Sequence, residues 1–179
     1  MNRPKIYFIT GVNTSGKSTL VPLLLKILPA GFFVRDFDAR GVPKNVDEKW
    51  RQNTTKFWLE FAYRNYRRGI STVISGLAIP SEIHRVVRKT FRRRIKIAFL
   101  EVSAKQISKR LYRRCSTPAK VKNLKEVTGL TVTECIAANI KHAQVLRKDC
   151  KKFKCRTFNT SHVKVERTAA KVGQWIIAS

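Results

Sequence analysis

The chain has 179 residues, of which 43% are apolar and 27% charged, a composition that fits one globular domain and leaves too little length for a second core. Lysine and arginine number 38 against 11 aspartate and glutamate residues, a formal net charge of +27. This excess indicates either a polyanionic partner, such as nucleic acid, or a basic host proteome and a phosphate-rich substrate, and composition alone does not separate these explanations.

Five apolar runs predict β-strands, at residues 5–10, 32–35, 71–74, 95–102 and 155–158. Helical patterns separate and follow them, at residues 18–28, 47–68, 80–90, 105–114, 131–148 and 163–177. The lysine-rich segment 115–130 lacks such a pattern, and we expect it to be irregular. Strands that alternate with helices predict an α/β domain, a three-layer sandwich in which helices cover both faces of a parallel sheet. Ligands bind such sheets beyond the carboxyl ends of the strands.

The first strand leads into GVNTSGKS, residues 11–18, which fits the phosphate-binding pattern G-x-x-x-x-G-K-[S/T] at every fixed position. Glycines let backbone N–H groups wrap around a phosphate, and the N-terminus of the following helix adds partial positive charge. We expect Lys17 to reach the β- and γ-phosphates of ATP and Ser18 to offer its hydroxyl to Mg²⁺. The predicted nucleotide-binding residues are Gly11, Asn13, Thr14, Ser15, Gly16, Lys17, Ser18 and Thr19.

The second strand leads into VRDFDAR, which places two carboxylates two residues apart near this phosphate cradle. Phosphoryl transfer depends on positioning, charge and a base for the attacking hydroxyl. We predict Asp38 as the base or substrate anchor and Asp36 as a second carboxylate on the Mg²⁺ side. Arg35 and Arg40 flank the pair and are candidates to hold an anionic group of the substrate. The alternative is that an aspartate caps a turn and that each arginine lies on the surface.

The third strand ends in Ser75-Gly76, where many enzymes with a phosphate cradle carry an aspartate on the Mg²⁺ side. A serine here argues against a motor-type ATPase, which needs an acidic residue for metal and water. The ligands of the Mg²⁺ ion would then be Ser18, water and Asp36. Glu82, in the first turn of the next predicted helix, is either a substrate contact or a residue that complements the helix dipole.

The fourth strand is followed by a cationic helix and the lysine-rich segment, which together are typical of a lid that closes over phosphates, at about residues 113–131. Arg110, Arg113 and Arg114 are candidates to neutralise charge on the transferred group. Arg110 and Arg114 lie four residues apart, on one helix face, and are the predicted catalytic pair. A solvated helix face is the alternative.

The four cysteines form no CxxC pair and have no histidine at zinc-ligand spacing, which argues against a zinc site and indicates reduced thiols. The longest apolar stretch is interrupted by Lys26 and Pro29 and is too short to span a bilayer. No signal-peptide pattern precedes the first strand. We therefore expect a cytoplasmic protein.

The order of these motifs resembles that of small P-loop kinases, the group that includes shikimate, gluconate, adenylate and nucleoside kinases and polynucleotide 5′-kinases. The resemblance covers residues 1–179 as one domain, and the cradle is its most specific part. It implies a five-stranded parallel sheet of order 2-3-1-4-5 and an acceptor-binding region at about residues 41–69. Trp50, Arg51 and Gln52 in this region, and Gly76 beyond it, are candidates for contact with the acceptor. Core packing is the alternative for Trp50.

The resemblance leaves two assignments of the catalytic base. DFD is similar to the D-x-D motif of shikimate kinases, whose second aspartate engages the substrate hydroxyl, which implies Asp38. VRDFDAR is also similar to the Arg-Asp segment of polynucleotide 5′-kinases, where the aspartate after the arginine is the base, which implies Asp36. Both assignments are open at this point.

The leading interpretation is an ATP- and Mg²⁺-dependent phosphotransferase that moves the γ-phosphate to a hydroxyl or phosphate of a small metabolite, such as a nucleoside or nucleotide. The runner-up is a polynucleotide 5′-hydroxyl kinase that acts on RNA or DNA ends, which the net charge favours. A third interpretation is a nucleotide-binding ATPase or regulatory module without phosphotransfer. The DFD motif and Ser75 argue against it.

Overall fold

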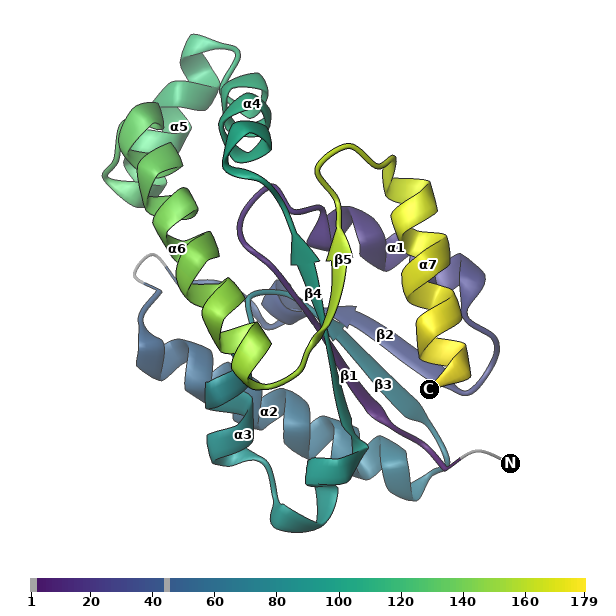
Figure 1. Cartoon of the computed structure of the whole chain (residues 1–179). Helices are drawn as coiled ribbons and strands as arrows, with labels where there is room; N and C mark the ends of the chain where they lie inside the picture. The colour runs from purple at the N-terminus through teal and green to yellow at the C-terminus, as the bar shows by residue number, and fades with distance from the viewer. Residues whose placement is uncertain (1–2, 44–45) are drawn as a thin grey trace.

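The computed structural model describes residues 3–43 and 46–179, and five parallel strands form its centre (Figure 1). They are β1 (Ile6–Thr10), β2 (Phe32–Asp36), β3 (Ser71–Ser75), β4 (Ile95–Glu101) and β5 (Arg156–Asn159). Their order in the sheet is β2-β3-β1-β4-β5, so the predicted fold class and strand order are confirmed. All neighbouring strands run parallel, so every carboxyl end lies at one edge of the sheet and every amino end at the other.

Two pairs of helices cover the faces of the sheet. Helix α1 (Lys17–Ile27) packs against α7 (Val165–Ala178) on one face, and α2 (Glu48–Arg67) packs against α3 (Pro80–Val86) on the other (Figure 1). Local signals mark where α2 and α3 begin: Asp47 accepts a hydrogen bond from the Trp50 N–H at the start of α2, and Pro80 occupies the first turn of α3. Three layers result, as predicted.

The central strand β1 contributes side chains to both faces, as its alternation requires. Ile6 and Phe8 belong to the apolar cluster under α2 and α3, together with Trp58. Tyr7 and Ile9 belong to the cluster under α1 and α7. All five residues of β1 are buried, so the loop that follows it is anchored at the centre of the molecule.

Three further helices follow β4: α4 (Ala104–Arg114), α5 (Pro118–Thr128) and α6 (Val132–Lys152). Helices α4 and α5 lie beyond the carboxyl edge of the sheet, and α6 runs back from there past β4 to α3 (Figure 1). Helix α4 packs against α6 over a third apolar cluster that includes Ile107 and Leu146. Thr131 and Glu134 form the predicted capping box at the start of α6. Helix α5 lies at the far end of this group.

The expectation of an irregular segment at residues 115–130 is wrong, because α5 occupies most of it. Its ends carry ordinary helix signals: the Thr117 side chain accepts from the Lys120 N–H, Pro118 stands in the first turn, and Gly129 closes the helix with a φ of 71°. The helix buries none of its described residues, which explains why an apolar pattern was missing.

The predicted helix 80–90 is also shorter than expected. It ends at Val86, and a 3₁₀ segment, η2 (Lys89–Arg94), leads into β4. Elsewhere the observed boundaries agree with the predicted ones to within a few residues. Within the described parts of the chain, no helix is both long and apolar enough to cross a membrane.

The carboxyl end of β3 touches η1 (Phe37–Arg40), the 3₁₀ turn that follows β2. A Cβ atom on Gly76 would lie 2.0 Å from the Phe37 Cβ. Phe37 is buried, and its carbonyl accepts a hydrogen bond from Trp58 Nε1 at 2.9 Å. The absence of a side chain at Gly76 therefore lets the turn that carries DFD sit against the sheet.

We predict that Gly76→Ala destabilises the protein by about 3 kcal/mol, since the added methyl group overpacks a buried contact. Urea unfolding measures the loss. The matched control is Gly31→Ala, whose added Cβ meets no atom within 4 Å and carries only the penalty of a φ of 94°, about 1 kcal/mol. Equal losses for the two variants would contradict the close packing of Gly76 on Phe37.

Candidate active site

The GVNTSGKS segment forms the loop between β1 and α1, at the carboxyl edge of the sheet. Thr14 has a φ of 67° and Gly16 a φ of 98°, left-handed conformations of the kind that occurs in anion-binding turns. Such a conformation is uncommon for a non-glycine residue and occurs preferentially at binding sites. The Thr14 and Ser15 hydroxyls are buried and have no hydrogen-bond partner within the described residues. The loop therefore has the shape of an anion-binding turn.

Lys17 directs its ammonium group back into this loop, where Nζ donates to the Val12 carbonyl oxygen at 2.8 Å. Burial lowers the pKa of Lys17 to about 8, and the nearby carboxylates of Asp38 and Asp36 partly oppose the shift. A partly dehydrated cation at the mouth of an anion-binding turn gains more from a phosphate than a hydrated one does.

A cavity of about 330 Å³ opens over the cradle and the first turn of α1. The exposed side chains of Asn13, Ser18 and Thr19 lie on the cradle side of this space. Arginines of α4 lie on the other side: Arg110, Arg113 and Arg114. The space between them is thus bounded by backbone donors, hydroxyls and guanidinium groups, the groups that bind phosphate.

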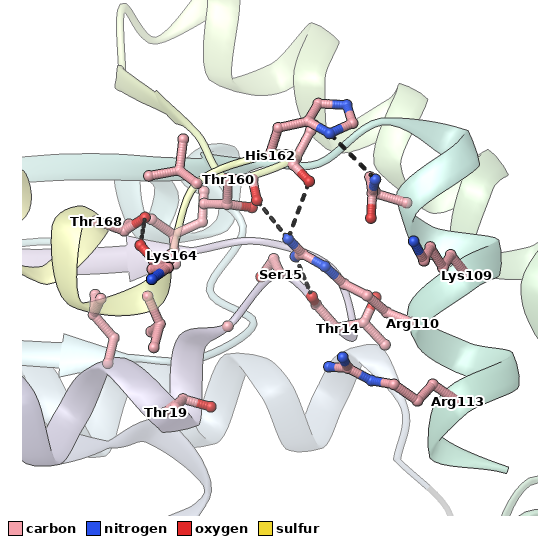
Figure 2. A pocket seen from close by; sticks show the side chains of 17 residues that line it. Thr14, Ser15, Thr19, Lys109, Arg110, Arg113, Thr160, His162, Lys164 and Thr168 are labelled. Atoms are coloured by element: carbon pink, nitrogen blue, oxygen red, sulfur yellow. Dashed lines mark hydrogen bonds between the residues drawn. The ribbon is translucent and has the colours of Figure 1, made fainter. Parts of the chain in front are cut away.

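A second cavity of about 550 Å³ adjoins the cradle and extends between α4 and the loop from β5 to α7 (Figure 2). Its side chains come from the cradle (Thr14, Thr19), from α4 (Lys109, Arg113) and from the β5–α7 loop (His162). The volume suits a nucleoside attached to phosphates in the first cavity. Sequence reasoning missed the β5–α7 loop, because no local motif marks it.

Arg110 occupies the centre of Figure 2 and is bound by backbone carbonyls. Its guanidinium donates to the Thr14 carbonyl at 2.9 Å and also to the carbonyl of Thr160. Arg110 therefore ties the strained residue of the cradle to the β5–α7 loop. Arg113 and Arg114 are exposed and border the cavity of about 330 Å³ over the cradle. The structure thus brings all three candidate arginines to the cradle, but Arg110 alone among them is bound to backbone carbonyls.

The two carboxylates of the DFD segment have different surroundings: Asp36 caps a turn, and Asp38 interacts electrostatically with Lys17 of the cradle. Asp36 Oδ1 accepts a hydrogen bond from the Asp38 N–H at 2.9 Å and so caps η1. Asp38 is exposed on the outer side of this turn, and its pKa lies above its ordinary value, first because of partial desolvation and then because of Asp36, while Lys17 acts in the opposite direction. Asp38 thus has the electrostatic setting of a proton acceptor beside the cradle.

The two arginines that flank DFD rest on aromatic rings. The guanidinium carbon of Arg35 lies 5.5 Å from the centroid of the Phe33 ring, and that of Arg40 lies 4.7 Å from the centroid of the Phe57 ring. Both side chains are exposed. These cation–π contacts stabilise the arginines at the surface without neutralising their charge.

An ion pair and a histidine line the region expected to bind the acceptor. Arg51 Nε and Nη2 donate to the two carboxylate oxygens of Glu82 at 2.9 and 2.7 Å, and Glu82 is only 4% exposed. The pKa of His142, on α6, is lowered by burial and by the charges of Arg51 and Lys17, so it is held neutral near both. Sequence reasoning proposed Arg51 and Glu82 separately and missed both their pairing and His142, which lies far away in the chain.

Trp50, Gln52 and Ser75 make packing or hydrogen-bond contacts within the protein. Trp50 is half-buried and packs edge-on against Phe37, with ring centroids 6.1 Å apart. Gln52 donates to the Glu48 carboxylate on the exposed side of α2. Ser75 is buried, and its hydroxyl donates to the Lys17 carbonyl at 3.2 Å. The part of the acceptor region at residues 44–45 lies outside the described residues.

The donors at the cradle fit a magnesium ion that enters with the nucleotide. Within residues 3–43 and 46–179, no group of three or more His, Cys, Asp or Glu side chains is arranged to hold a metal. Magnesium commonly binds nucleotide phosphates, waters and only one or two protein oxygens. The exposed Ser18 hydroxyl and the Asp36 carboxylate are suitable protein ligands.

Comparisons with known proteins extend this description. No protein-family model and no curated protein sequence matches the chain. Among solved structures, it is similar to shikimate kinase from Acinetobacter baumannii in complex with shikimate, with 15% identity, 98% of this chain and 94% of that chain covered, and a TM-score of 0.60. It is also similar to the APS kinase CysC of Mycobacterium tuberculosis, with 14% identity, full coverage of both chains and a TM-score of 0.54.

A third similar structure is a chain of the Pnkp1/Rnl/Hen1 RNA repair complex. The identity is 14%, the match covers 83% of this chain and 46% of that chain, and the TM-score is 0.54. At these identities the comparisons establish the fold. The chain has a P-loop kinase-like fold, with the sheet order and flanking helices of these kinases.

Proposed function

We propose that this protein is an ATP- and Mg²⁺-dependent kinase that transfers the γ-phosphoryl group to a hydroxyl or phosphate of a small metabolite, such as a nucleoside or nucleotide. The observation that carries the proposal is the electrostatic coupling of Asp38 with Lys17 of the cradle, in which each charge shifts the pKa of the other group. A nucleotide-binding module without transfer needs the lysine but has no use for a carboxylate of raised pKa beside it.

The proposed reaction uses the residues as follows. Asp38 accepts the proton of the acceptor hydroxyl, whose oxygen then forms a bond to the γ-phosphorus while the bond from that phosphorus to the β–γ bridging oxygen breaks and ADP leaves. Lys17 and the exposed Arg113 and Arg114 stabilise negative charge on the transferred group and on ADP. Bound Mg²⁺, which Ser18 and Asp36 would help to hold, would supply further charge neutralisation. Arg110 positions the cradle rather than the phosphate.

The proposed acceptor region lies between α2, α3 and α6. Because Glu82 engages Arg51 through two hydrogen bonds, the pair is held rigidly and can present the unused N–H groups of Arg51 to an acceptor. Neutral His142 adds a hydrogen-bond donor or acceptor nearby. These groups suit a polar acceptor that is oriented by several hydrogen bonds.

A polynucleotide 5′-hydroxyl kinase is the second candidate. It is supported by the net charge of +27 and by the exposed arginines beside the cradle, which could contact a phosphodiester backbone. The two candidates share the cradle and the base and differ in the size of the acceptor. One assay with separate acceptor pools therefore tests both.

We predict that the protein transfers label from [γ-³²P]ATP, in the presence of Mg²⁺, to at least one pool among metabolites, nucleosides, nucleotides and 5′-hydroxyl oligonucleotides. Lys17→Ala should lower the rate by about 1000-fold, because it removes a preorganised charge at the transferred group. Circular dichroism and thermal unfolding establish that this variant is folded. Wild-type protein that binds ATP but labels no pool would contradict the proposed function.

The two aspartates should respond differently to substitution. We predict that Asp38→Asn lowers kcat by about 100-fold or more, with little change in ATP affinity, since it removes the proton acceptor. Asp36→Asn keeps an oxygen that can cap η1 and can still ligate Mg²⁺, and it should lower transfer less than Asp38→Asn does. Steady-state kinetics with the labelled acceptor measures both. A fully active Asp38→Asn together with an inactive Asp36→Asn would assign the base to Asp36.

Nucleotide binding should depend on pH through Lys17. In the free protein its pKa is about 8, and bound phosphates raise it because they favour the ammonium form. Binding therefore takes up a proton, and affinity for ATP should fall as the pH rises above about 8, by up to tenfold per pH unit.

Isothermal titration calorimetry in buffers of different ionisation enthalpy measures this proton uptake directly. Lys17→Arg is the matched control, because arginine stays charged across the same range and should abolish the dependence. An affinity of the wild-type protein that is constant between about pH 7 and about pH 9 would contradict the assigned pKa.

A further inference from the structure

Positive charge gathers at the amino edge of the sheet, opposite the cradle. The last turn of α2 and the residue after it carry Arg64, Arg67 and Arg68, just before β3. The η2 segment carries Arg92, Arg93 and Arg94, just before β4. The end of α6 and the turn after it carry Lys151, Lys152 and Lys154, just before β5, whose first residue pairs with Ala98 in the middle of β4. We call these nine residues the basic rim.

Aromatic contacts join the first two segments of the rim to each other and the third segment to α3. Phe91 of η2 packs against Tyr66 of α2, with ring centroids 5.0 Å apart, and the Arg94 guanidinium lies 5.0 Å from the centroid of the same tyrosine ring. On the other side, His84 of α3 stacks on Phe153, at the end of α6, with centroids 4.5 Å apart. The first two segments therefore form one edge of the molecule, and α3, which leads into η2, connects the third segment to it. Figure 1 shows the end of α2 and the segment between α3 and β4 together at the bottom of the view, away from α4 and the cradle loop.

The rim charges are exposed and uncompensated. All nine side chains are exposed except Arg94, which is half-buried on Tyr66. Across the described residues, no carboxylate forms an ion pair with any of the nine, although five such pairs occur elsewhere in this part of the chain. The charge of Arg92 also acts on a neighbouring side chain. The pKa of His84 is lowered, first by burial and second by Arg92.

Helix stabilisation does not account for this arrangement. A cation in the last turn of a helix interacts favourably with the helix dipole, by about 0.3–1 kcal/mol. The rim continues past the helix ends, however, to Arg68 and Lys154, and includes consecutive arginines at 92–94. Like charges closer than the Debye length of about 8 Å repel one another at physiological salt. A polyanion that binds along the edge relieves this repulsion.

We propose that the basic rim binds the phosphodiester backbone of a nucleic acid, at a surface separate from the cradle. Arginine forms six of the nine charges, and its planar guanidinium pairs well with phosphates along a strand. An anionic membrane is less suitable, because membrane-surface segments combine basic charge with an exposed apolar anchor. None of the exposed large apolar residues of the described chain lies in the rim segments 64–68, 91–94 or 151–154. This inference does not depend on the proposed kinase activity.

The test measures binding of a fluorescent single-stranded RNA of about 20 nucleotides, 5′-phosphorylated, by anisotropy at several salt concentrations. The rim variant carries Arg67→Gln, Arg68→Gln, Arg92→Gln and Arg93→Gln. The matched control removes the same charge from exposed sites elsewhere, by Lys26→Gln, Lys105→Gln, Arg167→Gln and Lys171→Gln.

We expect the wild-type protein to bind the RNA with a steep salt dependence. The rim variant should bind at least about tenfold more weakly at moderate salt, with a slope of log K against log[salt] that is smaller by about 2 to 3, since each contacted phosphate of a single strand contributes about 0.7. The control should keep most of the affinity and slope. Saturating ATP and Mg²⁺ should leave RNA binding unchanged, because the rim lies apart from the cradle.

Three results would overturn the proposal: no binding at low salt, equal weakening of the rim and control variants, or displacement of the RNA by ATP. Binding of the wild-type protein to phosphatidylserine vesicles but not to RNA would assign the rim to a membrane instead. Retention of ATP binding by the rim variant shows that the variant is folded and separates loss of the rim from loss of the proposed active site.

Discussion

The proposed site depends on one constraint, a lysine ammonium that the fold keeps partly stripped of water beside an anion-binding turn. Lys17 has the Val12 carbonyl as its hydrogen-bond acceptor, and its lowered pKa records the cost of this position. Several elements maintain it: the buried strand β1 anchors the loop, Ser75 of β3 bonds to the Lys17 backbone, and Arg110 of α4 holds the Thr14 carbonyl. Because these groups converge on one loop, the cradle is shaped before a ligand arrives.

The distribution of charge follows from the parallel topology. Loops after the strands gather at the carboxyl edge, where cations face a cradle, hydroxyls and the two carboxylates of DFD. Helix ends that precede the strands gather at the opposite edge, where the basic rim has no carboxylate partners among the described residues. The first edge has the features of selective phosphate chemistry, and the second has those of attraction to a long polyanion. Much of the large net charge thus lies on two surfaces, one in which cations are mixed with carboxylates and hydroxyls and one in which they are not.

Much of the fold could be predicted because its signals are local. The run at residues 5–10, the cradle motif and the Thr131–Glu134 capping box each act within a few residues, and all occur as expected. The sequence pattern does not reveal α5, because this helix buries little and is marked only by signals at its ends, namely Thr117, Pro118 and Gly129. The candidate site residues that the sequence offers lie in the segments that directly follow strands. The pairing of Arg51 with Glu82, the neighbourhood of His142 and the carbonyl contacts of Arg110 arise from tertiary packing between distant segments, which local patterns do not encode.

The most direct test of the central claim is a crystal structure of the protein with Mg²⁺ and a non-hydrolysable ATP analogue. The account predicts that Lys17 Nζ leaves the Val12 carbonyl and contacts the β- and γ-phosphates, with the nucleoside between α4 and the β5–α7 loop. It also predicts that the Asp38 carboxylate faces the side of the γ-phosphate that an acceptor approaches. A triphosphate bound away from the cradle, or an Asp38 side chain turned away from the γ-phosphate, would contradict the account.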